Sequence, residues 1–181
     1  MVEYICKKEE IVMINEKLEK AFNDQINKEL YSEYLYLSMK IHFQQLNLQG
    51  FVNWFDVQVQ EEHAHAVGMM NYLDERGGNC VLEAIDKPVI EGKTIIEIFE
   101  QVLKHEEYVT SRINYLADVA EEVKDRAALH FLEWYLKEQV EEESSVNGVL
   151  TTLKLIGDDK KALLMLDKDL ATRVFNPPVI G

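Results

Sequence analysis

Long segments in which apolar residues recur every three or four positions alternate along the chain with short segments that lack this pattern. Steps of three and four are the spacing of one face of an α-helix. The pattern predicts four long helices and a shorter fifth one, over residues of about 15–42, 50–76, 94–121, 125–155 and 159–173. Asn15 is a suitable N-cap, Gly77 a suitable helix stop, and Pro177 blocks further helix. We therefore expect a single all-α domain over residues 1–181.

The lengths of the connections predict how these helices pair. Short connections over 44–49 and 121–125 join the first two and the next two helices, so each pair should form an antiparallel hairpin. Residues 79–93 contain Pro88 and are expected to be extended, a length that spans roughly 50 Å. Such a segment can return along the whole bundle. The expected fold is an up-down four-helix bundle with one long crossover between its second and third helices.

One line of core-facing positions on each long helix is apolar at both ends and polar in the middle. The four lines are Leu18, Phe22, Gln25, Glu29, Ser32, Tyr36 and Met39; Phe51, Phe55, Gln58, Glu62, His65, Met69 and Tyr72; Ile95, Phe99, Val102, Glu106, Val109, Ile113 and Leu116; and Ala128, Leu132, Tyr135, Gln139, Glu142, Val146, Val149 and Leu153. A carboxylate inside a bundle is unfavourable unless it is paired or binds a metal. Any single carboxylate would also fit a solvated helix face, but four carboxylates on four separate core lines favour a metal site.

The donor set indicates which ions such a site would bind. Carboxylates suit hard or borderline cations, and carboxylates able to bridge suggest two ions. A single imidazole among carboxylates, His65, favours iron, although zinc or manganese could use the same ligands.

Composition limits the kinds of partner that the protein can bind and indicates its cellular location. The formal charge of −14 argues against nucleic acid or an anionic membrane as partner and fits a protein that attracts cations. Two cysteines supply neither a disulfide framework nor a four-cysteine metal site, so we expect a reducing, cytoplasmic location. Cys6 is interpreted as a terminal thiol and Cys80 as a small buried hydrophobe. The N-terminus has no apolar run longer than Ile11 to Ile14, so neither a secretory signal nor a membrane span is expected.

Several runs of residues resemble a known family. They are Asn27-Lys-Glu-Leu-Tyr-Ser-Glu-Tyr-Leu-Tyr36, Glu61-Glu-His-Ala-His65, Lys104-His-Glu-Glu107 and Trp134-Tyr-Leu-Lys-Glu-Gln-Val-Glu-Glu-Glu143. From about residue 12 to 172 the chain resembles the prokaryotic non-haem ferritins, within the ferritin-like di-iron carboxylate family. Gln139-x-x-Glu142 stands where bacterioferritins and rubrerythrins carry a second Glu-x-x-His, which again resembles ferritins.

The resemblance implies three iron sites. Glu29, Glu62 and His65 would bind one iron. Glu62, Glu106 and Gln139 would bind a second, with Glu62 bridging. Glu142 would lie near the second iron and be shared with a third site, whose ligands are Glu61, Glu138, Glu141 and Glu142. Independently, positions 138, 141 and 142 lie at i, i+3 and i+4, on one side of a helix. Tyr36 would lie against the two irons as a hydrogen-bond donor and one-electron donor, or be a core aromatic with a satisfied hydroxyl.

The resemblance also implies an activity and an assembly. Fe(II) would be oxidised by O₂ or H₂O₂, and Fe(III) would be stored as mineral in a hollow homo-oligomer of 24 subunits. The fifth helix supports this, because the smaller twelve-subunit starvation proteins lack it. Its apolar line, Ala162, Leu166 and Leu170, could be buried around a four-fold axis or within its own subunit. The alternatives are a di-iron oxidase or peroxidase on the same bundle, and a plain helical interaction protein; two cysteines exclude a rubrerythrin.

Other positions depart from related families. His63 occupies the place where bacterioferritins carry a haem-binding methionine, and we expect a surface or interface histidine there without haem. His42, His105 and His130 lack a partner at metal-ligand spacing and are interpreted as structural. Leu129 and Leu132 stand where animal ferritins have an acidic pair lining an iron channel, so the usual entry route is in doubt.

Overall fold

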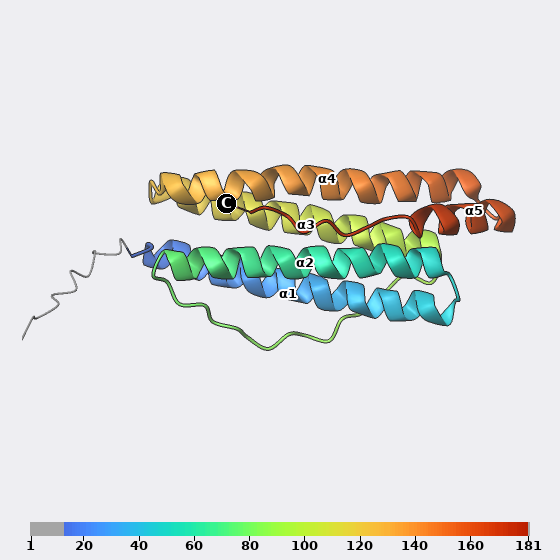
Figure 1. The fold of residues 1–181 in the computed structure, drawn as a ribbon, viewed down its shortest axis with the longest axis horizontal. Coiled ribbons are helices and arrows are strands. Elements are labelled where there is room, and N and C mark those ends of the chain that lie inside the picture. The colour runs from blue at the N-terminus through green and yellow to red at the C-terminus, as the bar shows by residue number, and fades with distance from the viewer. Residues whose placement is uncertain (1–12, 181) are drawn as a thin grey trace, which may run out of the picture.

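The computed structural model describes residues 13–180, and within that range it contains α-helices and no strands. The helices are α1 (Glu16–Gln45), α2 (Gln49–Glu75), α3 (Ile95–Glu122), α4 (Arg126–Ile156) and α5 (Lys160–Leu170). The predicted fold class, a four-helix bundle with a short fifth helix, is confirmed (Figure 1). None of the helices in the described range is long and apolar enough to cross a membrane.

The long connection between α2 and α3 sets the topology. In Figure 1 this segment runs beside α1 from one end of the bundle to the other, so α3 starts at the same end as α2 and lies parallel to it. The short turns leave α1 antiparallel to α2 and α3 antiparallel to α4. The predicted crossover is therefore present.

Asparagine side chains of α1 hold the crossover against the bundle. The backbone nitrogen of Val81 donates to Asn23 Oδ1 at 2.6 Å, and Asn27 Nδ2 donates to the Val81 carbonyl at 3.0 Å. Asn27 Oδ1 then accepts from the backbone nitrogen of Glu83 at 2.8 Å. Because Asn23 and Asn27 are four residues apart, both amides face the same side of α1. These amides satisfy backbone groups that would otherwise need a neighbouring strand.

Cys80 lies in this segment and is exposed, so the prediction that it is a small buried hydrophobe is wrong. The reason is that polar amides, and not apolar side chains, hold the crossover at this point. Cys6, the expected terminal thiol, lies outside the described residues.

Two apolar clusters form the core. One contains Phe22, Tyr72 and Phe131, with the last two rings stacked at 4.1 Å between centroids. The other contains Phe43, Phe55 and Phe99. Every predicted core position on the four long helices is buried except Ile95, which is half-buried at the first residue of α3. The polar middles of the four lines are buried between the two clusters.

Helix α5 closes one end of the bundle. Leu163, Leu166 and Leu170 pack against the second cluster and are partly buried there. Two of the three residues of the predicted apolar line, Leu166 and Leu170, thus contact the core of their own chain, and Ala162 is partly buried. Asp167 Oδ1 accepts from the backbone nitrogens of Gly50 and Phe51 at 2.8 and 3.1 Å. Leu48, the N-cap residue of α2, makes no side-chain cap of its own, so Asp167 caps α2 from another helix. A Cβ atom at Gly50 would lie 1.5 Å from the Asp167 carbonyl oxygen, which explains the glycine.

Replacing Asp167 by Ala should therefore loosen the first turn of α2. Loss of an N-cap costs about 1 kcal/mol, so local hydrogen exchange over residues 49–52 should rise about fivefold. Asp169→Ala, on an exposed position of the same helix, is the matched control and should change nothing there. Equal exchange in the two variants would show that Asp167 does not cap α2.

Candidate metal centre

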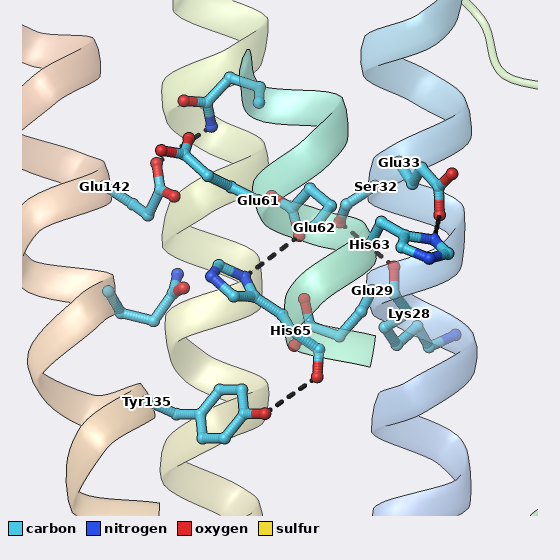
Figure 2. A network of polar contacts seen from close by, with 12 residues as sticks. Lys28, Glu29, Ser32, Glu33, Glu61, Glu62, His63, His65, Tyr135 and Glu142 are labelled. Atoms are coloured by element: carbon cyan, nitrogen blue, oxygen red, sulfur yellow. Dashed lines mark hydrogen bonds and ion pairs between the residues drawn. The ribbon is translucent and has the colours of Figure 1, made fainter. Parts of the chain in front are cut away.

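Three of the predicted ligands meet in the middle of the bundle. Glu29 of α1 and Glu62 and His65 of α2 each offer a ligand atom, and these atoms all lie within 4.8 Å of one another. All three residues are at most 3% exposed. Figure 2 shows Glu62 and His65 facing each other, with 3.7 Å between Glu62 Oε2 and His65 Nδ1. Their spacing of three residues places both on one face of α2.

Two carboxylate oxygens of this group lack partners. Glu29 Oε2 and Glu62 Oε2 are buried and accept no hydrogen bond from any described residue. The other oxygen of Glu29 accepts from Gln25 Nε2 at 2.8 Å. An unsatisfied buried acceptor costs about 1–3 kcal/mol, and more when it is charged. Oxygen and nitrogen donors converging with free lone pairs fit a divalent cation such as Fe²⁺.

Glu106 of α3 is fully buried and has two hydrogen-bond partners. The hydroxyl of Tyr36 donates to its Oε1, and Gln139 Nε2 lies 3.4 Å from its Oε2. Glu106 and Gln139, two members of the predicted second set, are therefore in contact. The Gln139 amide presents its nitrogen to Glu106 here, and ligation would require its oxygen to face the ion. Tyr36 touches the site as expected.

The structure partly assembles the predicted third set. Ligand atoms of Glu138 and Glu142 of α4 lie within 4.8 Å of each other and of His65. Glu61 points to Arg173 instead, with 2.7 Å between Glu61 Oε2 and Arg173 Nη2. Glu141 is exposed and has Lys137 Nζ 3.9 Å from its carboxylate. His65 thus stands between the two groups of acids, a position that helical spacing did not reveal.

Two further residues contact the centre. Gln58, on the core line of α2, donates from Nε2 to Glu142 Oε2 at 3.0 Å. Its place on that line was visible in the sequence, although its partner was not. Arg173 follows α5 and reaches both Gln58 and Glu61. No local pattern marks it, because its partners are more than 100 residues away in the chain.

The remaining histidines lie apart from these groups. His105 is largely buried, and its Nε2 lies 2.8 Å from Ser32 Oγ; burial lowers the pKa of its imidazole to about 4. His63 and His130 are exposed beside Glu33 and Glu133, and His42 stacks edge-on against Phe43.

The two leucines at the channel positions of animal ferritins are packed inside the bundle. Leu132 is fully buried, and Leu129 is partly buried against the same apolar cluster. The placement of Leu132 at a pore is therefore excluded, because its side chain fills the core.

A family model described as a ferritin-like domain matches residues 19–156 of the chain. The chain belongs to the ferritin family. It is 37% identical over 164 residues to the bacterial non-heme ferritin of Staphylococcus aureus (strain MRSA252), covering 91% of this chain and 99% of that protein. A probable bacterial non-heme ferritin-like protein of Haemophilus influenzae is 39% identical over 158 residues, covering 87% and 96%. The resemblance to prokaryotic non-haem ferritins is thus confirmed.

Solved ferritins share the fold closely. A structure titled "Humanized Archaeal ferritin" superposes with a TM-score of 0.89 at 49% identity, covering 91% of this chain and 99% of that one. An open pore ferritin from the hyperthermophilic archaeon Archaeoglobus fulgidus gives a TM-score of 0.87 at 48% identity, covering 89% and 98%.

Burial and mutual repulsion control the protonation of this ferritin's central acids. Burial raises the pKa of Glu62 well above its usual range, and the negative charges of Glu106 and Glu29 add to this. Burial and the charge of Glu142 raise the pKa of Glu106 to about 8, against the hydrogen bonds from Tyr36 and Gln139 that lower it. Burial, followed by the charge of Glu106, raises the pKa of Tyr36 well above its usual range. Without metal, Glu106 therefore holds a proton at neutral pH that a cation would displace.

The metal-free ferritin should therefore lose stability as the pH rises. An unfolded Glu106 releases its proton near pH 4.5, whereas the folded one keeps it to about 8. Between these values the folded chain binds more protons, so the free energy of unfolding falls, by up to ~1.4 kcal/mol per pH unit for each extra proton. Thermal unfolding in chelator at pH 5, 7 and 9 measures this.

The Glu106→Gln variant is the comparison. It removes the titrating carboxyl group, so the free energy of unfolding should fall less between pH 5 and 8 than in the parent. Parallel curves for the variant and the parent would contradict the assignment to Glu106.

Proposed function

We propose that this ferritin oxidises Fe(II) in the centre of its bundle and stores Fe(III) as mineral in a hollow shell. The observation that carries the proposal is the buried group of Glu29, Glu62 and His65, with two carboxylate oxygens left without partners. A helical protein that only mediates contacts would gain nothing from unpaired acids in its core, because each one destabilises the fold.

We infer the ligand sets from the resemblance to ferritins, and the meeting of Glu29, Glu62 and His65 supports them. One Fe²⁺ binds Glu29, Glu62 and His65, and a second binds Glu62, Glu106 and Gln139, so Glu62 bridges the two ions. Glu142 lies beside the second ion and is shared with a third site that includes Glu61, Glu138 and Glu141. The proximity of His65 to Glu138 and Glu142 supports a route from the inner pair to that outer site.

The chemistry is a two-electron oxidation of two Fe²⁺. Two Fe²⁺ give one electron each to O₂, which takes up two protons to become H₂O₂; with H₂O₂ as the oxidant, two protons yield two water molecules. Carboxylates favour the Fe³⁺ product because they are hard oxygen donors. Tyr36 orients Glu106 through its hydroxyl and is placed to act as a one-electron donor.

The product is stored in a homo-oligomer of 24 subunits in the cytoplasm. A charge of −14 on each chain would concentrate Fe²⁺ at such a shell. Outside the partly buried line of α5, Leu164 and Met165 are 56% and 68% exposed, which supports a subunit contact there. One structural relative is described as an open pore ferritin, so pores in the shell are a natural alternative to narrow channels for iron entry.

Replacing Glu62 and His65 together by Ala should abolish rapid iron oxidation while leaving the assembly intact. Both residues bind the first ion and Glu62 binds the second, so the initial rate should fall by at least about 100-fold. Stopped-flow absorbance of Fe(III) measures it.

The matched control is the double variant His130→Ala and Glu133→Ala. It removes a histidine and a glutamate with the same spacing of three residues from an exposed face of α4. The control should oxidise iron at the parent rate. If the Glu62 and His65 variant did so too, the site would be wrongly assigned.

Loading the protein with excess Fe²⁺ without oxygen, and then admitting air, distinguishes storage from its alternative. Storage predicts hollow particles of 24-subunit mass with electron-dense cores, seen by light scattering and negative-stain microscopy of one sample. Oxidation that stops at about two or three irons per chain without a core would instead indicate a di-iron oxidase or peroxidase on the same bundle.

A further inference from the structure

The segment after α5 turns back along the bundle and lies between α2 and α4 in Figure 1. Its first residues are fixed to α2 by Asn53, whose Nδ2 donates to the carbonyl oxygens of Leu170 and Arg173 at 3.1 and 2.9 Å. Farther along, Ile180 packs close to Gly68 of α2. The backbone that carries Arg173 is therefore held in place before the side chain makes any contact.

The guanidinium of Arg173 makes three kinds of contact with α2. Its Nη2 donates to Glu61 Oε2 at 2.7 Å, and its Nη1 donates to Gln58 Oε1. It also lies over the ring of Trp54, 5.0 Å from the centroid. The side chains of Arg173 and Glu61 are only 24% and 19% exposed, so this ion pair is partly shielded from water.

These contacts bring a fixed positive charge to the edge of the metal centre. Gln58, which accepts from Arg173, donates in turn to Glu142. Glu142 forms a group with Glu138 and His65, whose ligand atoms lie within 4.8 Å of one another. Glu61 forms the ion pair with Arg173. Glu61 and Glu142 are both ligands of the third site proposed above. One carboxylate oxygen of Glu61, Oε2, is thus already paired with a cation.

We propose that Arg173 competes with the third metal ion for Glu61, so that the outer site fills only after the inner two sites. This inference rests on the proposed function. A divalent ion that binds Oε2 of Glu61 breaks the ion pair, and one that binds the other oxygen still lies beside the guanidinium, which repels it. Glu29, Glu62 and His65 have no such competitor among the described residues, whose ion pairs leave these three without lysine or arginine. Iron therefore collects first where it is oxidised.

Titration of the assembled, metal-free protein with Zn²⁺, followed by calorimetry, tests this without any oxidation. In Arg173→Gln the third ion should bind about tenfold more tightly, because a partly shielded charge is removed, while the first two affinities stay unchanged. Arg173→Lys keeps the charge and should bind the third ion as the parent does.

Arg112→Gln is the matched control. Arg112 is also 24% exposed, forms an ion pair with Asp24 and lies 4.8 Å over the ring of Tyr115, away from the metal centre. Its removal should leave all three zinc affinities unchanged. Hydrogen exchange over residues 171–173 gives a second readout: because Asn53 holds this backbone, exchange should be the same in Arg173→Gln as in the parent, which separates loss of the charge from loosening of the tail.

The outcomes distinguish a failure of this inference from a failure of the proposed function. If the parent fills two inner sites and the third affinity is the same in Arg173→Gln, the inference is wrong and the function stands. An equally large gain in affinity for the third zinc ion in Arg173→Lys would also overturn it, because loosening of the tail would then be the cause. The same gain in Arg112→Gln would overturn it too, because the total charge would then be the cause. If the parent binds neither Zn²⁺ nor Fe²⁺ in the bundle, the proposed function fails together with the inference.

Discussion

Mutual repulsion among acids buried at one level of a helical bundle is the constraint around which this ferritin is built. Glu29, Glu62, Glu106 and Glu142 are each at most 3% exposed and come from all four long helices. Together they would force the helices apart unless protons or metal ions neutralised them. The aromatic clusters on either side oppose that force, because a buried Phe or Leu contributes roughly 1.5–3 kcal/mol. The polar layer can exist only because well-packed apolar layers flank it.

The neighbours of these acids keep them available to cations. Hydrogen bonds to the inner carboxylates come from amides and a hydroxyl, those of Gln25, Tyr36 and Gln139. Neutral donors satisfy some of the lone pairs without supplying positive charge, so a divalent ion entering the layer displaces protons and not a salt bridge. A lysine in the same place would stabilise the metal-free bundle and reduce its affinity for metal. Among residues 13–180, the guanidinium that approaches these groups belongs to Arg173 and lies at the outer edge.

Helix α5 and the segment after it join the end of the bundle to this outer edge. Asp167 caps α2, and six residues later Arg173 reaches Glu61 on the same helix. The two contacts have opposite electrostatic character: a carboxylate lies at the positive end of a helix dipole, and a cation lies beside an acidic group. A chain segment remote from the inner ligands is thus structurally linked to the proposed third site.

The helices, their pairing and the polar layer could all be predicted from the order of the amino acids. Periodicity of three and four is a local property, so the core positions of α1, α2 and α4 follow from it without error, and only Ile95 of α3 is less buried than expected. The length of the crossover decided its course, because no other path joins two parallel helices of this size.

The contacts between residues far apart in the chain became visible only in the folded structure. The cap from Asp167, the Asn23 and Asn27 contacts that leave Cys80 exposed, and the pairing of Glu61 with Arg173 join residues far apart in the chain. Periodicity shows which face of a helix is buried, but not which side chain from another segment reaches it. That depends on the path of irregular backbone, and no repeat in the sequence encodes such a path.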